Sequence, residues 1–203
     1  MKVQSVSNLF PHTVMAYTLD IDDKYIIKYL KKIPYNMNHV HYGEAGIGIS
    51  KSFTILDHLP KLVKETERSY KHYIEEILRL NTKFRLANSW ATKAIPNAET
   101  VFHFHKNTWL SAVYYPQSDP AFIVQFSTPT APDGFWAMGV PRDYNIHNSL
   151  VWNITPEKNT LLVFNSMLAH RIAQNTSKNT RYSIASNMMP KGVIGFHDTK
   201  VVL

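Results

Sequence analysis

Two closely spaced histidines in the stretch VFHFHKNTWLSAVYY, residues 101 to 115, have the residue type and spacing to do chemistry. Side chains alternate between the two faces of a strand, so His103 and His105 would share one face. Residues two apart on a strand lie roughly 6.5 to 7 Å apart, a spacing from which two imidazoles can reach one metal ion. The alternative is a pair of half-buried histidines whose ring nitrogens are satisfied within the fold. A third ligand would favour the metal site.

The best candidate for a third ligand is His170, in the stretch TLLVFNSMLAHRIAQNTSKNTRYSIASN. The runs HRIAQ and RYSIAS flank the turn-like NTSKNT, a pattern that predicts a β-hairpin. A turn centred near Thr176 would set His170 opposite Arg181, with Ser183 on the same face. The sequence therefore predicts an arginine beside a possible metal ligand.

An inward-facing Arg181 would need an anion. A buried guanidinium is costly unless it is paired, and its planar fork suits a carboxylate. No acid in the nearby strands is an obvious partner, so the carboxylate could arrive with a ligand. Alternatively, Arg181 is an exposed strand residue or pairs with Glu157 or Asp198.

The composition restricts the class of protein. The chain of 203 residues contains no cysteine, so disulfides and thiol catalysis are excluded and a metal must be held by His, Asp or Glu. No apolar run approaches the length of about 18 residues needed to cross a membrane, and the N-terminal segment lacks the pattern of a signal peptide. We therefore expect a soluble, cytoplasmic protein with no membrane partner. The net charge of +7 is scattered along the chain and is only weak support for nucleic-acid binding.

The hydrophobic pattern predicts one domain over 1–203, with a helical lead-in at 1–82 and a β-rich core at 83–203. Three-and-four spacing of apolar residues predicts helices at 20–33 and 59–80. Short alternating runs then predict about eight strands, near 84–94, 100–105, 109–115, 121–127, 135–139, 149–154, 160–164 with 169–174, and 181–188. The expected fold is α+β, a double-stranded β-helix (jelly roll) whose N-terminal helices pack on one sheet.

Residues 84–190 resemble the iron(II)- and 2-oxoglutarate-dependent oxygenase superfamily, in particular its prolyl-hydroxylase-like members. In that superfamily a His-x-Asp/Glu pair begins a strand, a distant His completes the metal site, and an Arg or Lys about ten residues later binds the far carboxylate of 2-oxoglutarate. His103, His105, His170 and Arg181 occupy those places. The stretches NSW, HFH, LSAVYY and TRYSIASN are similar to a branch in bacteria and bacteriophages that has His-x-His at the first position; a phage-encoded protein would act in the host cytoplasm.

The resemblance implies an enzyme, a 2-oxoglutarate-dependent dioxygenase. It would use Fe(II), 2-oxoglutarate and O2 to hydroxylate a C–H bond, with release of succinate and CO2. The implied metal ligands are His103, His105 and His170, and the residues implied to bind 2-oxoglutarate are Arg181, Ser183, Tyr115, Ser111 and Asn88. Tyr115 could equally be an aromatic of the sandwich core.

One position departs from the superfamily pattern, because His105 stands where a carboxylate is usual. Three neutral imidazoles would leave the charge of the metal to the dianionic co-substrate. If His105 points away, an anion or Asp119 could complete the coordination shell.

The substrate and the exact activity stay open. The substrate is expected to be a small molecule or a protein side chain, selected by loops at 116–121 and 128–145. Nucleic-acid demethylases of the same superfamily carry a second arginine six residues beyond the first, where this chain has Asn187. A three-histidine dioxygenase that needs no co-substrate would instead use Arg181 to bind the carboxylate of its substrate. A jelly-roll binding module without enzymatic activity is also compatible with the sequence.

Overall fold

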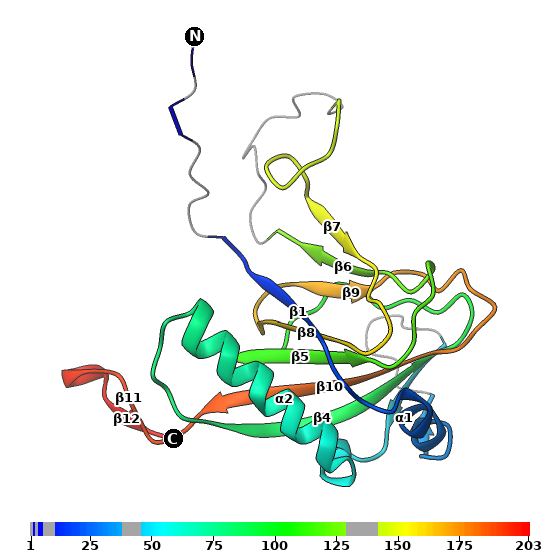
Figure 1. The fold of residues 1–203 in the computed structure, drawn as a ribbon, viewed down its shortest axis with the longest axis horizontal. Coiled ribbons are helices and arrows are strands. Elements are labelled where there is room, and N and C mark those ends of the chain that lie inside the picture. The colour runs from blue at the N-terminus through cyan, green and yellow to red at the C-terminus, as the bar shows by residue number, and fades with distance from the viewer. Residues whose placement is uncertain (1, 3, 6–10, 38–45, 129–141) are drawn as a thin grey trace.

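The computed structural model describes residues 2, 4–5, 11–37, 46–128 and 142–203. These residues form a seven-stranded and a three-stranded antiparallel β-sheet, a separate two-stranded hairpin and two α-helices (Figure 1). The major sheet has the strand order β1-β8-β5-β10-β4-β3-β2, and the minor sheet has the order β7-β6-β9. The strands of the major sheet are β1 (Val14–Thr18), β2 (Tyr35–Asn36), β3 (Ile47–Ser50), β4 (Phe84–Ala94), β5 (Leu110–Tyr115), β8 (Thr160–Asn165) and β10 (Arg181–Pro190). Those of the minor sheet are β6 (Val124–Ser127), β7 (Val151–Ile154) and β9 (His170–Ile172).

The helices cover one face of the major sheet. Helix α2 (Pro60–His72) continues into a π-helical turn, η2 (Tyr73–Ile77), and lies across β5, β10 and β4 in Figure 1. Its buried Tyr70 donates a hydrogen bond to the carbonyl oxygen of Ser186 on β10 at 2.8 Å. Helix α1 (Asp23–Leu30) packs at the other end of the sheet and buries Ile26 and Leu30. Both predicted helices are present, and the expected packing of helices on one sheet is confirmed.

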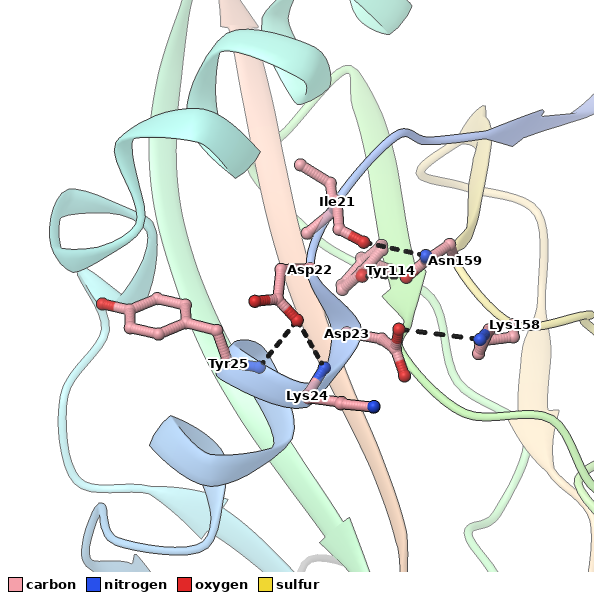
Figure 2. A network of polar contacts seen from close by, with 8 residues as sticks. All are labelled: Ile21, Asp22, Asp23, Lys24, Tyr25, Tyr114, Lys158 and Asn159. Atoms are coloured by element: carbon pink, nitrogen blue, oxygen red, sulfur yellow. Dashed lines mark hydrogen bonds and ion pairs between the residues drawn. The ribbon is translucent and has the colours of Figure 1, made fainter.

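A polar network fixes the chain that enters α1 (Figure 2). The Asp22 carboxylate accepts hydrogen bonds from the backbone N–H groups of Lys24 and Tyr25, which satisfies donors that an α-helix leaves free at its start. Behind it, the side-chain amide of Asn159 donates to the carbonyl oxygen of Ile21 and accepts from the hydroxyl of Tyr114. The network therefore links the segment before α1 to the loop before β8 and to the central strand β5.

The other face of the major sheet packs against the minor sheet. Alternation along β5 and β10 directs Tyr114 and Ile184 toward the helices, and Val113, Tyr115 and Ala185 toward the second core. That second core also holds residues of the minor sheet, among them Val124 and Phe126. Two facing antiparallel sheets with helices on one outer face form the predicted double-stranded β-helix. Among the described residues, no helix has the length and apolar character that a membrane crossing requires.

Two predictions about the strands are wrong, one about a hairpin and one about a continuous strand. The stretches around β9 and β10 do not form a hairpin, because β9 pairs with β6 whereas β10 pairs with β4 and β5. The chain between them crosses from one sheet to the other and is held by the buried Asn175, whose side-chain amide contacts the carbonyl oxygens of Ala94, Ile95 and Asn179.

The segment 100–105 is also not a continuous strand. It contributes a single β-bridge, between His103 and His170, while Phe102 and Phe104 face solvent. The other predicted strands within the described residues lie near their predicted places, and β4 has the predicted bounds. The strands β1, β2 and β3 were not predicted, and they lie in the segment 1–82 that was expected to be a helical lead-in. The predicted strand 135–139 lies outside the described residues.

Near the C-terminus, the short strands β11 (Val193–Ile194) and β12 (Val201–Val202) form a two-stranded hairpin that stands away from both sheets (Figure 1). The 3-10 turns η1 (Ile55–His58) and η3 (His197–Thr199) precede α2 and connect the two strands of the hairpin, respectively.

Candidate metal centre

Three histidines from distant parts of the chain converge between the two sheets. His170 opens β9, and His103 and His105 lie on the segment beside it. Backbone hydrogen bonds set this arrangement, because His103 and His170 exchange N–H···O bonds of 3.0 and 2.9 Å, and the N–H of His105 donates to the carbonyl oxygen of Ser166. The nearest ring nitrogens of the three imidazoles lie within 4.8 Å of one another.

In each of the three imidazoles, the Nδ1 atom lies within hydrogen-bond distance of an oxygen atom. Nδ1 of His103 lies 2.9 Å from the carbonyl oxygen of Val101, and Nδ1 of His170 lies 3.0 Å from that of Leu168. Nδ1 of His105 lies 2.8 Å from the side-chain oxygen of Asn187. A carbonyl oxygen only accepts, so Nδ1 carries the hydrogen and the lone pair of each neutral ring is on Nε2. All three lone pairs are therefore free for a metal ion.

His105 and His170 are held neutral by their surroundings. Burial, together with the neighbouring histidines, lowers the pKa of His105 to about 4 and that of His170 to about 3. Aromatic rings form part of the apolar surroundings, with Phe164 at 4.8 Å from His170 and Trp90 at 5.2 Å from His105 between ring centroids. Neutral imidazole is the form that binds a metal.

These pKa values predict how acid affects the metal-free protein. Both lie below the ordinary histidine value of about 6.5, so the unfolded chain takes up protons before the folded chain does. Stability is fully present above about pH 6.5 and falls below it, down to about pH 4 for His105 and about pH 3 for His170. We expect each ring to contribute a loss of up to about 1.4 kcal/mol per pH unit in its window.

Urea unfolding of the metal-free protein at a series of pH values measures this loss. The variant His105→Gln should lose less stability with acid than the wild type, because one of the two depressed groups is gone. Equal slopes of unfolding free energy against pH in the two proteins would contradict the assignment of depressed pKa values.

Arg181 lies nearby, buried and incompletely paired. It is 2% exposed, and its Nη1 donates to the carbonyl oxygen of Ile123 at 3.0 Å. The atoms Nε and Nη2 are buried without a hydrogen-bond partner. Its guanidinium carbon lies 5.1 Å from the centre of the Tyr115 ring, and burial lowers the pKa of the guanidinium. The alternative of an exposed Arg181 is wrong, and no ion pair joins it to Glu157 or Asp198, both within the described chain.

The three histidines line a cavity of about 310 Å³ between the sheets. Its wall includes all three histidines together with Tyr115 and Ser183, and no Asp or Glu is among its described lining residues. The other lining residues are apolar for the most part and include Ile47, Ile49, Phe53, Trp90, Val113, Val124 and Ile172. The structure thus brings His103, His105, His170, Tyr115 and Ser183 to one cavity, with Arg181 buried beside Tyr115.

Three further candidate residues from the sequence lie elsewhere. Ser111 is fully buried behind His105, 2.9 Å from its Nδ1, and does not line the cavity. Asn88 is on β4, exposed, and also outside the lining. Asp119 accepts hydrogen bonds from Ser177 and from the backbone N–H of Ala121, away from the histidines. Because His105 points into the cluster, Asp119 is not needed as a substitute ligand.

Sequence reasoning missed two residues that contact this site. Asn187 and Ser166, both buried, complete a polar cluster with Ser111 behind His105. Asn187 is one of three alternating polar residues on β10, with Arg181 and Ser183, which all face the same side of the strand. That alternation could have placed Asn187 on the same face of the strand as Arg181 and Ser183, although it does not identify His105 as its partner.

Residues 88–187 match the model of the putative 2OG-Fe(II) oxygenase family, and the chain belongs to this family. The matched region runs from β4 to β10 and contains all three histidines and Arg181. The family consists of oxidoreductases that use Fe(II) and 2-oxoglutarate, so the chain is a 2-oxoglutarate-dependent oxygenase. No curated protein matches the chain.

Three solved structures illustrate the proteins that share this fold. HygX from Streptomyces hygroscopicus, crystallised with nickel and 2-oxoglutarate, has a TM-score of 0.58 at 9% identity over 88% of this chain and 83% of its own. A prolyl-4-hydroxylase from Pseudomonas putida has a TM-score of 0.56 at 14% identity, covering 88% of this chain and 93% of its own. A prolyl hydroxylase from Trichoplax adhaerens, in complex with a peptide of hypoxia inducible factor, has a TM-score of 0.60 at 11% identity, covering 87% and 83%. At these identities the likeness shows the fold alone.

Proposed function

We propose that the protein hydroxylates a C–H bond of its substrate, with Fe(II) held by His103, His105 and His170 and with 2-oxoglutarate anchored by Arg181. One observation carries this proposal, namely that a buried guanidinium with two unpaired nitrogen atoms lies beside a cavity lined by three convergent histidines. The guanidinium calls for an anion, and the three histidines offer nitrogen ligands to a metal cation.

The chemistry of the donors supports an iron site. Imidazole nitrogen is a ligand that suits Fe(II), and each of the three rings keeps its Nε2 lone pair free while Nδ1 is hydrogen-bonded. The ring nitrogens lie within 4.8 Å of one another, so small side-chain rotations suffice to bring them onto one ion. His105 would take the place of the carboxylate that is usual at this position.

The charge balance supports a dianionic co-substrate. The described lining of the cavity contains no acid, so neither the metal nor Arg181 would be neutralised by the protein. A molecule with two carboxylates supplies the missing charge, one end meeting the metal and the other meeting Nε and Nη2 of Arg181. Ser183 and Tyr115, which line the same cavity, would bind that second carboxylate.

The protein contributes binding and exclusion of water. Bound Fe(II) with 2-oxoglutarate and O2 supplies the oxidation itself, with release of succinate and CO2. Apolar side chains such as Ile47, Val113 and Val124 line the cavity and limit the access of water to the reacting groups. The volume of about 310 Å³ suits a small molecule or a side chain of a protein as substrate.

The three-histidine ligand set also favours a second candidate, a dioxygenase that needs no co-substrate. In that enzyme Arg181 would bind a carboxylate of the substrate itself. The two candidates differ in whether 2-oxoglutarate binds to the iron-loaded protein in the absence of any substrate.

Anaerobic titration of the Fe(II)-loaded protein with 2-oxoglutarate tests the proposal. We expect a weak visible absorption band that saturates with 2-oxoglutarate, followed by succinate formation when O2 is admitted. Succinate, a dicarboxylate that lacks the 2-oxo group, is the matched control and should give no band. Absence of the band and of succinate formation in iron-loaded protein would contradict the proposed function.

A further inference from the structure

A buried polar cluster lies behind His105, on the side away from the cavity. It consists of Ser111 on β5, Ser166 after β8 and Asn187 on β10, which are 0%, 0% and 7% exposed. The side-chain oxygen of Asn187 lies 2.8 Å from Nδ1 of His105 and accepts the hydroxyl hydrogen of Ser111 at 2.9 Å. The Ser111 oxygen lies a further 2.9 Å from both Nδ1 of His105 and the hydroxyl of Ser166.

This cluster permits only one tautomer of the His105 ring. If Nδ1 carried the lone pair, it would face the acceptor oxygen of Asn187 at 2.8 Å, and two buried acceptors would repel each other. A Ser111 hydroxyl turned toward Nδ1 would not relieve this contact, because the Asn187 oxygen would still lie 2.8 Å from the lone pair. Nδ1 must therefore carry the hydrogen, and the lone pair is on Nε2.

His105 differs from the other two histidines because the hydrogen-bond acceptor for its Nδ1 lies on a distant strand. His103 and His170 each donate Nδ1–H to the carbonyl oxygen two residues before them in the chain, on Val101 and Leu168. The corresponding carbonyl for His105 is that of His103, which already accepts the N–H of His170 in the β-bridge. Asn187, 82 positions along the chain, supplies the acceptor that the local backbone does not.

We propose that Asn187 is a positioning residue that, supported by Ser111, makes His105 a metal ligand by fixing its tautomer and the direction of Nε2. This inference rests on the proposed function in taking His105 as a ligand. Partners of this kind, hydrogen-bonded to ligating histidines, typically change metal affinity by about 10- to 100-fold when removed. A neutral amide at this position keeps the acceptor without adding charge to the buried cluster.

The first experiment measures the tautomer in the metal-free protein by correlation of ring nitrogens with ring carbon-bound hydrogens in 15N-labelled samples. We expect the His105 signal of the wild type to show hydrogen on Nδ1, and Asn187→Ala to shift it toward hydrogen on Nε2. The matched control is Ser186→Ala, which removes a buried hydrogen-bonding group from the opposite face of the same strand and should leave the tautomer unchanged. A wild-type ring with hydrogen on Nε2 would overturn the inference, whether or not the variant folds.

The second experiment measures Co(II) affinity, with Co(II) as a spectroscopic substitute for iron. We expect Asn187→Ala to bind Co(II) about 10- to 100-fold more weakly than wild type. Asn187→Asp, which retains an acceptor oxygen at the same place, should bind at least as tightly as wild type, and Ser186→Ala should match wild type. The inference is overturned if Asn187→Ala keeps wild-type affinity or if Asn187→Asp is as weak as Asn187→Ala.

The outcomes separate this inference from the proposed function. If His105→Ala binds Co(II) as tightly as wild type, His105 is not a ligand and the proposed metal site fails, whatever the tautomer. If His105→Ala loses Co(II) but Asn187→Ala keeps both the tautomer and the affinity of wild type, the metal site stands and only the positioning role of Asn187 is rejected.

Discussion

His170→Ala is expected to abolish tight binding of Fe(II), with a loss of affinity of at least about 100-fold, because removal of a partner that only orients a ligand already costs about 10- to 100-fold. His170 is the most buried ring of the cluster, and its centroid lies 4.6 Å from that of His103 and 5.0 Å from that of His105. The other two imidazoles alone would leave most of the coordination shell to water. Anaerobic calorimetry with Fe(II) measures the affinity directly.

The loss of Fe(II) binding in His170→Ala should also be visible in measurements of the melting temperature. A metal that binds only the folded chain raises the stability of that chain, so Fe(II) should stabilise the wild type and leave His170→Ala unchanged. The matched control is His197→Ala, at an exposed histidine in η3 of the C-terminal hairpin (Figure 1). His170→Ala with wild-type affinity for Fe(II) would remove the histidine cluster as the metal site.

Arg181→Met is expected to have two effects of opposite sign. Co-substrate binding should weaken by at least about 30-fold, because truncating one partner of a buried, hydrogen-bonded charge pair costs about 2 to 5 kcal/mol. The metal-free, ligand-free protein should become more stable, because the substitution replaces a buried charge that has two unpaired nitrogen atoms by an apolar side chain of similar length. Iron binding should be retained.

The first effect is measured as the 2-oxoglutarate concentration that gives half-maximal succinate formation, and the second as the unfolding free energy without ligands. Arg181→Lys is the matched control, which keeps the charge but cannot form two parallel hydrogen bonds, so its co-substrate requirement should lie between those of wild type and Arg181→Met. An unchanged 2-oxoglutarate requirement in Arg181→Met would refute the proposed anchor. A marked loss of stability would show that the guanidinium already has its counterpart within the fold.

The fold was predictable from the sequence because its strands carry strong local signals. Alternating polar and apolar residues defined β4 to the residue, and the amphipathic pattern with Pro60 at its start indicated α2. The sequence placed His170 near Arg181 through a β-hairpin that does not form. In the structure, His170 lines the cavity between the sheets, and Arg181 is buried beside Tyr115, which lines the same cavity. Residue types and their spacing were therefore enough to indicate which side chains gather in the interior.

The strand pairing that brings these residues together was not predictable. Two apolar runs around a turn-like NTSKNT have the same local pattern whether they pair with each other or with strands far away in sequence. The strand pairing is decided by interactions between residues far apart in the sequence. Strand β9 pairs with β6, and β10 lies between β4 and β5. The contact of Asn187 with His105 was missed for the same reason, because local patterns contain no information on partners 82 positions apart.

The placement of His170 on the minor sheet and Arg181 on the major sheet has a mechanical consequence. A short, stiff dicarboxylate held by an ion at one end and by the guanidinium at the other would act as a crosslink between the two layers of the sandwich. Loading of the enzyme would then add a link between the two sheets to the packing of the second core.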